Sequence, residues 1–441
     1  MQARSFQLIM AALLVALPLS GALADTENYN WPNWRGPNAD GVAIAGNPPI
    51  TWSETENIKW KVAMPDAGDG TPIVWGDKMI FLTAIATAED KRTPPPKDAG
   101  REIFTPMPTV PYAFNVMCID KNTGETLWTT KVAEAIPHEG HHPSSSLAAY
   151  SPITDGELIW ASFGSRGIHC LDLDGNIKWS QPLPEMLIFR AFGEGSSPAI
   201  AGDAVIIQHD HEGDSKIFAF DKLTGDKLWE KDRDEATSWS SPIPVEVDGQ
   251  MQVITSGSNR IRSYDAKTGE IIWHSAGLTR GAVPTPVIGF NNVYCMTGYQ
   301  DPSVIAIELG YTGDLTDSDA ISWHVTESAP YIPCPVLYDN RLYMIENMKG
   351  ILSCYNAETG EALYEGQRLQ GMKQLYSSPI GAAGRLYISD RAGVTMVVKH
   401  ADTFEVLATN TLEDSFDSSA VVIGDELFLK GEKYLYCIAE Q

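Results

Sequence analysis

A two-residue motif recurs along the chain at nearly constant spacing, and it constrains the fold more than any other feature of the sequence. Seven pairs of a small residue and proline form this series, and Ser419-Ala420 is a degenerate eighth copy. After a first step of 80 residues, the copies follow at steps of 46, 44, 44, 49, 44 and 41 residues. A period of about 40–50 residues is typical of a repeat architecture in which each copy is one supersecondary unit. The seven full copies are Thr71-Pro72, Ser151-Pro152, Ser197-Pro198, Ser241-Pro242, Thr285-Pro286, Cys334-Pro335 and Ser378-Pro379.

Each copy continues with the same local signals, which predict four short strands per repeat. A turn pair such as Gly202-Asp203 leads into an apolar strand, and a third strand ends at an acidic or amide residue followed by a Thr-Gly turn, as in 221–225. Four strands in a unit of this length predict an all-β propeller, with the recurring aromatic of the fourth strand packed between neighbouring blades. That position is occupied by Trp60, Trp128, Trp179, Trp229, Trp273, Trp323, Tyr364 and Leu407.

The two ends of the repeat region complement each other. The last copy, 419–439, contains three strands and lacks a fourth, whereas 57–61 reads as an orphan fourth strand. Placing that strand on the last copy predicts a single eight-bladed propeller over 25–441, with four-stranded antiparallel blades and no exposed edge at the seam. The alternative, seven blades and an unrelated strand, leaves both ends unpaired.

The first residues resemble a targeting signal. Arg4 supplies a positive charge, 8–19 is mostly apolar, and Ala22-Leu23-Ala24 has the small residues of a cleavage site. We therefore expect a signal peptide over 1–24, cleaved near Ala24, and a periplasmic or secreted mature chain. An uncleaved anchor is the alternative. No other segment approaches about 18 apolar residues, so no membrane span is predicted.

The charge balance narrows the classes of partner. With 32 basic and 57 acidic residues, the formal net charge is −25. Phosphates would be repelled, which argues against nucleic acid or an anionic membrane surface as a partner. We expect a protein partner or a small ligand, and a monomer.

The six cysteines favour buried free thiols over a disulfide framework. Cys118, Cys170, Cys354 and Cys437 occupy matching points of different repeats, where they should face equivalent interiors. Whether Cys295 and Cys334 pair stays open, because sequence does not give their separation.

Strand order places two sets of loops on one face of the predicted ring. The loops that join the second to the third strand, and the fourth strand to the next blade, must lie together on the face where propellers usually bind ligands. Side chains on these loops suggest a polar ligand site at the channel mouth, in which arginines could clamp a carboxylate and an indole could stack on a ring. The opposing interpretation is that these residues seal the channel by bonding neighbouring loops; no metal ligands or catalytic residues are assigned. The candidates are His141, His142, Arg190, Asp210, His211, Trp239 and Arg280.

A proline-rich insertion in the first blade, 85–113, lies on the same face. It explains the long first step of the repeat, and its prolines predict an irregular, extended course. It could cover the channel mouth, present a docking surface or remain a solvated loop.

The repeat resembles a known family. The blades carry the pattern DxxTG-x₃-W, and the segments 31–37 (Trp-Pro-Asn-Trp-Arg-Gly-Pro) and 52–60 resemble the start of exported bacterial PQQ-like, or quinoprotein-type, repeat proteins. The arrangement is also similar to the eight-bladed outer-membrane assembly propellers.

The resemblance implies two possible functions, a scaffold and an enzyme, and the sequence favours one of them. Enzymes of the quinoprotein class have an adjacent Cys-Cys pair beside the quinone, and this chain has none. We therefore expect a binding or protein-interaction scaffold with a small-ligand site at the channel mouth. A PQQ-dependent dehydrogenase is the alternative, and PQQ is a cofactor by resemblance only.

Overall fold

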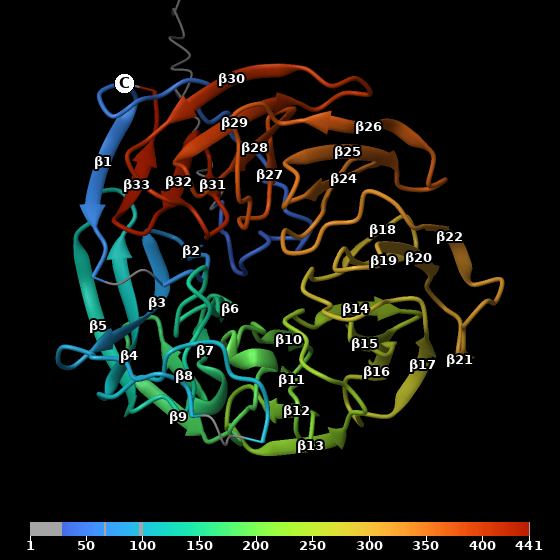
Figure 1. Cartoon of the computed structure of the whole chain (residues 1–441), viewed down its shortest axis with the longest axis horizontal. Helices are drawn as coiled ribbons and strands as arrows, with labels where there is room; N and C mark the ends of the chain where they lie inside the picture. The colour runs from blue at the N-terminus through green and yellow to red at the C-terminus, as the bar shows by residue number, and fades with distance from the viewer. Residues whose placement is uncertain (1–28, 66–67, 97–99, 441) are drawn as a thin grey trace, which may run out of the picture.

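Eight β-sheets form a ring around a central axis (Figure 1). The computed structural model describes residues 29–65, 68–96 and 100–440, so the predicted signal peptide, 1–24, lies outside the described residues. Within them, no helix is long and apolar enough to cross a membrane. The predicted all-β, eight-bladed propeller is confirmed.

Each blade is a four-stranded antiparallel sheet whose first strand lies nearest the axis. Blade 1 consists of β2 (Ile73–Trp75), β3 (Lys78–Ala86), β4 (Tyr112–Asp120) and β5 (Thr126–Ala135). The later strands are β6 (Ile153–Thr154), β7 (Leu158–Ser162), β8 (Ile168–Asp172) and β9 (Ile177–Gln181) in blade 2; β10 (Ala199–Ala201), β11 (Ala204–His209), β12 (Lys216–Asp221) and β13 (Lys227–Asp232) in blade 3; β14 (Ile243–Val247), β15 (Gln250–Thr255), β16 (Ile261–Asp265) and β17 (Ile271–Ser275) in blade 4; β18 (Val287–Gly289), β19 (Asn292–Thr297), β20 (Ser303–Glu308) and β22 (Ile321–Val325) in blade 5; β23 (Val336–Tyr338), β24 (Arg341–Glu346), β25 (Ile351–Asn356) and β26 (Ala362–Arg368) in blade 6; and β27 (Ile380–Ala382), β28 (Arg385–Ser389), β29 (Val394–Lys399) and β30 (Val406–Thr411) in blade 7.

The ring closes through the N-terminal strand. Blade 8 consists of β31 (Val421–Ile423), β32 (Glu426–Lys430) and β33 (Tyr434–Ile438), and β1 (Ile58–Ala63) pairs antiparallel with β33. Trp60 of β1 lies opposite Cys437. The seam is thus a complete sheet, as the sequence predicted, and chain segments more than 370 residues apart hold the ring shut.

A tryptophan and a glycine join neighbouring blades. Trp229 of blade 3 donates its indole N–H to the carbonyl of Ala266 in blade 4 at 2.9 Å. Gly269 of the same turn has φ +71°, and a Cβ there would lie 2.7 Å from the Trp229 ring. The glycine is therefore required both by its backbone angle and by the ring that covers it. The same indole-to-carbonyl bond joins Trp60 to Lys121, Trp128 to Leu173, Trp179 to Lys222 and Trp323 to Ala357.

Blade 5 departs from this pattern. Its third strand continues into a long connection in which β21 (Gly313–Asp314) pairs parallel with β17 of blade 4. The Thr312-Gly313 pair of this connection lies beside Trp273 of β17 and not beneath its ring, because a Cβ on Gly313 would meet nothing within 4 Å. Trp273 is 1% exposed in the core between blades 4 and 5. The repeat signal predicted the position of this tryptophan, but not the added strand.

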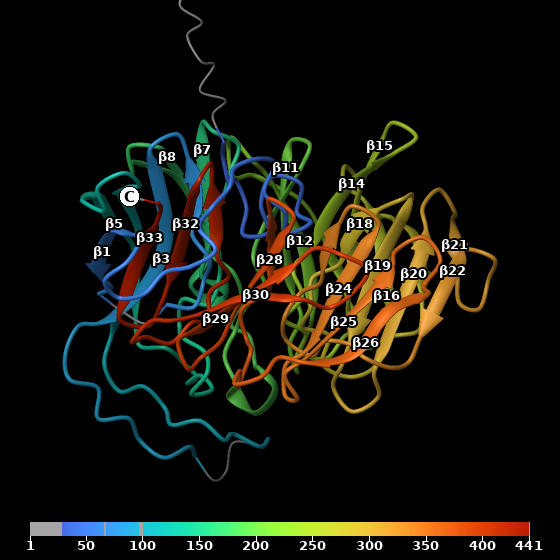
Figure 2. The same cartoon turned by 90° about the horizontal axis from the view of Figure 1, so that it is seen from above.

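The N-terminal segment crosses the end of the channel opposite the predicted site. The backbones of Trp31 and Val74 exchange two hydrogen bonds in blade 1, at 2.8 and 2.9 Å. On the far side, the buried Arg35 donates to the carbonyl oxygens of Pro335 (2.7 Å) and Pro379 (3.1 Å), in blades 6 and 7. We call this end, where the first and second strands are joined, the turn face, and the other end the mouth face. Figure 2 shows the N-terminal segment and the blade 1 insertion at opposite faces.

Candidate functional site

The small residues of the repeated proline motif form a closed circle of hydrogen bonds around the channel. Each donates its backbone N–H to the side chain of its counterpart in the next blade, over 2.9–3.1 Å. The last bond, from Ser419 to Thr71, closes the circle. The sequence showed the motif but not this role. The hydroxyl or thiol group present in every copy could have indicated it. The order is Thr71, Ser151, Ser197, Ser241, Thr285, Cys334, Ser378 and Ser419.

This hydrogen-bond circle surrounds a cavity of about 400 Å³. All eight residues of the circle line it, and Trp34 of the N-terminal segment lines it as well. Loops that connect one blade to the next supply most of the remaining lining. Those loop residues include Asp69, His142, Phe192, Glu194, Trp239, Tyr331, Tyr376 and Asp417.

Two of the seven predicted site residues line this cavity. Trp239 donates its indole N–H to the carbonyl of Gly193 at 2.7 Å, which fixes the ring beside the loop that leads into blade 3. His142 bonds Ser144 Oγ through Nδ1 at 2.6 Å, and its ring meets Phe192 edge to face at 5.1 Å. Burial, with the nearby Arg391 charge, lowers the pKa of His142, so its imidazole is neutral at pH 7.

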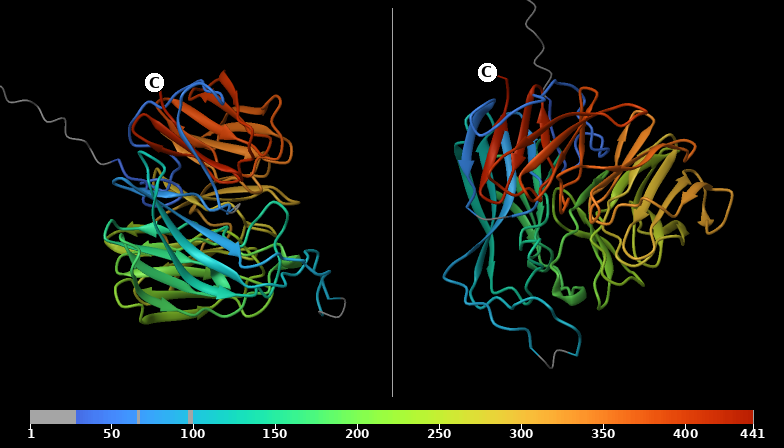
Figure 3. Two further views of the ribbon diagram at one scale, coloured as in Figure 1. Left: turned by 90° about the vertical axis from the view of Figure 1, so that its left-hand side faces the viewer. Right: turned by 45° about the horizontal axis from the view of Figure 1, so that its top comes forward.

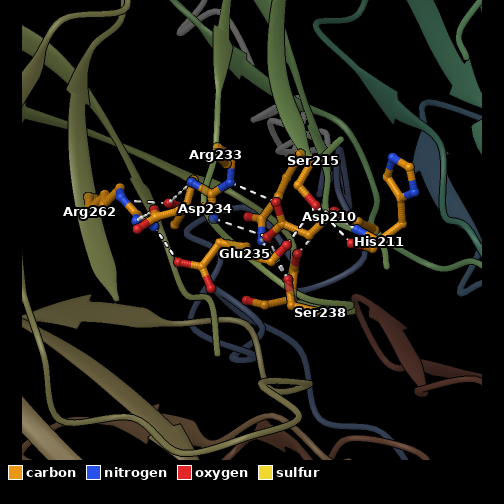
Figure 4. A network of polar contacts seen from close by, with 12 residues as sticks. Asp210, His211, Ser215, Arg233, Asp234, Glu235, Ser238 and Arg262 are labelled. Atoms are coloured by element: carbon orange, nitrogen blue, oxygen red, sulfur yellow. Dashed lines mark hydrogen bonds and ion pairs between the residues drawn. The ribbon is translucent and has the colours of Figure 1, made fainter. Parts of the chain in front are cut away.

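Asp210 lies in a buried ion pair and not at the cavity (Figure 4). Its carboxylate accepts from Arg233 Nε at 2.6 Å and Nη2 at 3.0 Å, and both side chains are 0% exposed. Gln208 and Ser238 also donate to it, each at 2.7 Å. Burial disfavours the Arg233 charge, but the adjacent carboxylate outweighs burial and raises the pKa of Arg233. This arrangement holds the loop between β13 and β14 against β11.

The other four predicted residues, His141, Arg190, His211 and Arg280, contact neighbouring loops of the mouth face. His211 accepts two backbone N–H bonds at its Nδ1, from Leu187 and Gly213, both at 3.1 Å. The guanidinium groups of Arg190 and Arg280 stack on the ring of Phe189, at 4.9 and 4.3 Å from its centroid. These contacts match the opposing interpretation of the sequence, in which polar side chains seal the loops.

The blade 1 insertion packs beside the cavity. It connects β3 to β4 over 87–111 and extends beyond the ring (Figure 3). Arg92 bonds the imidazole of His141 at 2.9 Å. Phe104 donates its backbone N–H to the carbonyl of Arg190, and its ring lies 6.3 Å from that of Phe192, which lines the cavity. The described residues of the insertion therefore touch the mouth without lining the cavity.

Two carboxylates of the lining differ in their partners. Asp417 pairs with Arg391 at 3.0 Å, and burial raises the pKa of Asp417 to about 6. Glu194 accepts from Tyr150 Oη at 2.9 Å and from the backbone N–H of Ser165 at 2.8 Å. Within the described part of the chain, no lysine or arginine forms an ion pair with Glu194. The sequence-based candidate set omitted Glu194, because an acidic residue in a loop has no distinguishing signal.

The six cysteines are free and buried, which confirms the interpretation as buried thiols and answers the open question about Cys295 and Cys334. Burial raises the pKa of Cys295 to about 12. Cys334 replaces a hydroxyl in the hydrogen-bond circle, where its Sγ accepts from the Thr285 N–H at 3.0 Å. Among the described residues, no group of three or more His, Cys, Asp or Glu side chains is placed to hold a metal ion.

A buried histidine of the mouth face predicts a pH-dependent stability. Burial lowers the pKa of His209 to about 4, whereas the unfolded residue titrates near 6.5. Only the unfolded state takes up this proton as pH falls from about 6.5 to 4, so His209 costs up to about 3 kcal/mol of unfolding free energy across that window.

Urea unfolding of the wild type and of His209→Phe at several pH values tests this prediction. The variant should lose less stability between pH 7 and 4 than the wild type, whatever its stability at pH 7. Parallel pH profiles would show that His209 is not held neutral.

Comparison with known proteins places the fold in a family. The family model described as outer membrane protein assembly factor BamB matches residues 113–364 and 237–441. Among solved structures, BamB from Moraxella catarrhalis superposes with a TM-score of 0.60 at 16% identity, covering 87% of this chain and 97% of that chain. The computationally designed protein Ika8 gives 0.55 at 11% identity, covering 89% and 100%. At these identities the solved structures establish the shared fold alone.

A europium-containing methanol dehydrogenase gives a TM-score of 0.46 at 13% identity, covering 92% of this chain and 90% of that chain, and carries no argument. No curated protein matches the chain. The family matches together run from residue 113 to residue 441. They cover most of the chain, which therefore belongs to the PQQ-like repeat family described as outer membrane protein assembly factor BamB.

Proposed function

We propose that the protein is an exported binding scaffold whose cavity at the mouth face receives a ligand. The observation that carries the proposal is the cavity itself, which the hydrogen-bond circle encloses and to which aromatic and acidic side chains converge. A concave site of about 300–1,000 Å³ with apolar walls and a few placed polar groups is the usual form of a small-ligand pocket. The proposed setting is the periplasm or the medium, in keeping with the predicted signal peptide.

The alternative of a PQQ-dependent dehydrogenase fits these residues poorly. PQQ carries three carboxylate groups, whereas the described cavity lining has neither lysine nor arginine, and its carboxylate Glu194 forms no ion pair within the described residues. Like charges in a pocket of low dielectric repel strongly. The cavity also contains a single cysteine, Cys334, where the quinoprotein enzymes have an adjacent pair. The site chemistry thus supports binding over quinone-dependent oxidation.

Family membership supports a scaffold that also binds a partner protein. The family is described by an outer membrane protein assembly factor, and a role in assembling other proteins is part of the proposal. Apolar side chains of the mouth face are available for such contacts: Phe104 is 54%, Leu187 41% and Met348 73% exposed. A partner docked there would also cover the cavity, because Met348 lines it.

A neutral aromatic probe tests the pocket without assuming the natural ligand. N-phenyl-1-naphthylamine fluoresces in apolar surroundings, and we expect about one equivalent to bind the mature protein. Val283→Trp places an indole at a position that lines the cavity, so it should reduce probe affinity at least about tenfold, which corresponds to about 1.4 kcal/mol.

Leu407→Trp is the matched control, because Leu407 is 39% exposed on the outer strand β30. It should leave probe binding unchanged. Equal binding to Val283→Trp and the wild type would reject the cavity as a ligand site, and tight uptake of one PQQ per chain would reject the scaffold proposal in favour of the dehydrogenase.

A further inference from the structure

The cavity combines aromatic faces with a carboxylate, Glu194, that forms no ion pair in the described part of the chain. Five aromatic side chains line it, and none of the described lining residues is lysine or arginine. A cation over an aromatic face is attracted by the ring quadrupole, and the attraction grows when water is excluded. The aromatic residues are Trp34, Phe192, Trp239, Tyr331 and Tyr376.

The two carboxylates differ in their nearest partners, because Asp417 has a directly paired arginine and Glu194 has only neutral hydrogen-bond donors, with Arg166 acting more distantly on Tyr150. Arg391 pairs with Asp417 at 3.0 Å and lies 5.5 Å from the centre of the Tyr376 ring. Glu194 is held by the neutral donors Tyr150 and Ser165, and no lysine or arginine in the described chain pairs with it. A partly buried carboxylate without a directly paired cation attracts one, because little water screens it.

Trp239 lies beside this carboxylate. Its indole N–H donates to Gly193, the residue before Glu194, and a Cβ on Gly195 would lie 3.6 Å from the Trp239 ring. The loop that carries Glu194 therefore runs beside the Trp239 ring, and both residues line the cavity. A cation on this side of the cavity would meet both.

The hydrogen-bond circle adds donors at the inner end of the cavity. Its side-chain oxygens accept from the neighbouring blade, so their O–H groups are available to a ligand. Five of these hydroxyls donate to no acceptor in the described part of the chain, although their residues are only 3–7% exposed. Buried donors of this kind are normally satisfied by water or by a ligand. They belong to Thr71, Ser151, Ser197, Ser241 and Ser419.

We propose that the cavity binds a small organic cation, an amine or quaternary ammonium group whose tail carries an oxygen acceptor. The cation lies between Glu194 and the Trp239 face, and the oxygen points toward the hydroxyls of the circle. The proposal rests on the cavity being the ligand site, and it adds the charge and shape of the ligand.

Choline and its neutral carbon analogue, 3,3-dimethylbutan-1-ol, isolate the charge, because they differ only at the nitrogen. In calorimetric titrations of the mature protein, choline should bind about tenfold or more tightly than the alcohol, as expected for a desolvated cation–π site. Equal binding of the two, or binding of neither, would overturn the proposal. This result is separate from the test of the pocket, because N-phenyl-1-naphthylamine binding can hold while charge selectivity fails.

Glu194→Gln removes the charge and keeps the size of the side chain. It should weaken choline binding about tenfold and leave binding of the neutral naphthylamine unchanged. Glu157→Gln is the control, since Glu157 is exposed in the turn between β6 and β7 on the opposite face. If the Glu194 variant binds choline as the wild type does, the proposed anchor is wrong. The choline–alcohol comparison uses the wild type and does not depend on how the variant folds.

Discussion

Asp210→Ala should lower the free energy of unfolding by about 3–5 kcal/mol, because removing one partner of a buried ion pair leaves the other charge without its directly bonded counter-ion. Arg233 would remain 0% exposed among β11, β15 and β16. Its remaining bonds, to Thr255 and Tyr264 Oη, are to neutral groups. Urea unfolding followed by far-UV circular dichroism measures the effect.

A surface pair supplies the control for this experiment. Lys399 and Glu405 pair at 2.7 Å with side chains about half exposed, and Lys399→Ala should cost no more than about 1 kcal/mol. If Asp210→Ala destabilises the protein no more than Lys399→Ala, the Asp210–Arg233 pair does not hold the mouth-face loops in place.

Gly225→Ala should cost about 2–5 kcal/mol, because it combines a strained backbone angle with overpacking between blades. Gly225 has φ +76°, and a Cβ there would lie 2.6 Å from the Trp179 ring. Since the indole also donates to the carbonyl of Lys222, it cannot retreat without losing that bond. Thermal and urea unfolding of the variant measure the loss.

Gly202→Ala separates the cost of backbone strain from the cost of overpacking between blades. Gly202 has φ +64°, and a Cβ there would meet nothing within 4 Å. This variant should cost only the backbone strain, about 1–2 kcal/mol. Equal losses for the two variants would mean that the contact between Trp179 and Gly225 contributes nothing to the docking of the blades.

The fold followed from the sequence because its signals are local and repeated. The proline motif, the Thr-Gly turn and the fourth-strand tryptophan each act within one blade or between two adjacent blades. Closure by β1 followed from counting strands. The parallel strand β21 was missed because it belongs to one blade only and has no repeated pattern.

The candidate site was predicted less completely, since a site depends on where loops point. Strand order grouped the loops of the mouth face, and His142 and Trp239 of these loops line the cavity. Asp210 was on the predicted face as well, but its side chain turns to Arg233, and no sequence pattern distinguishes a carboxylate that pairs internally from one that lines a pocket. Glu194 and the hydrogen-bond circle required the three-dimensional structure.

The location of a bound ligand tests the central claim, that the cavity at the mouth face is the ligand site. A crystal of the mature protein soaked with N-(4-bromophenyl)-1-naphthylamine gives an anomalous signal at the bromine. We expect one bromine peak inside the hydrogen-bond circle or at its mouth, in contact with the side chain of Trp239. Bromine peaks confined to the outer surface of the blades, or none in a fully soaked crystal, would contradict it.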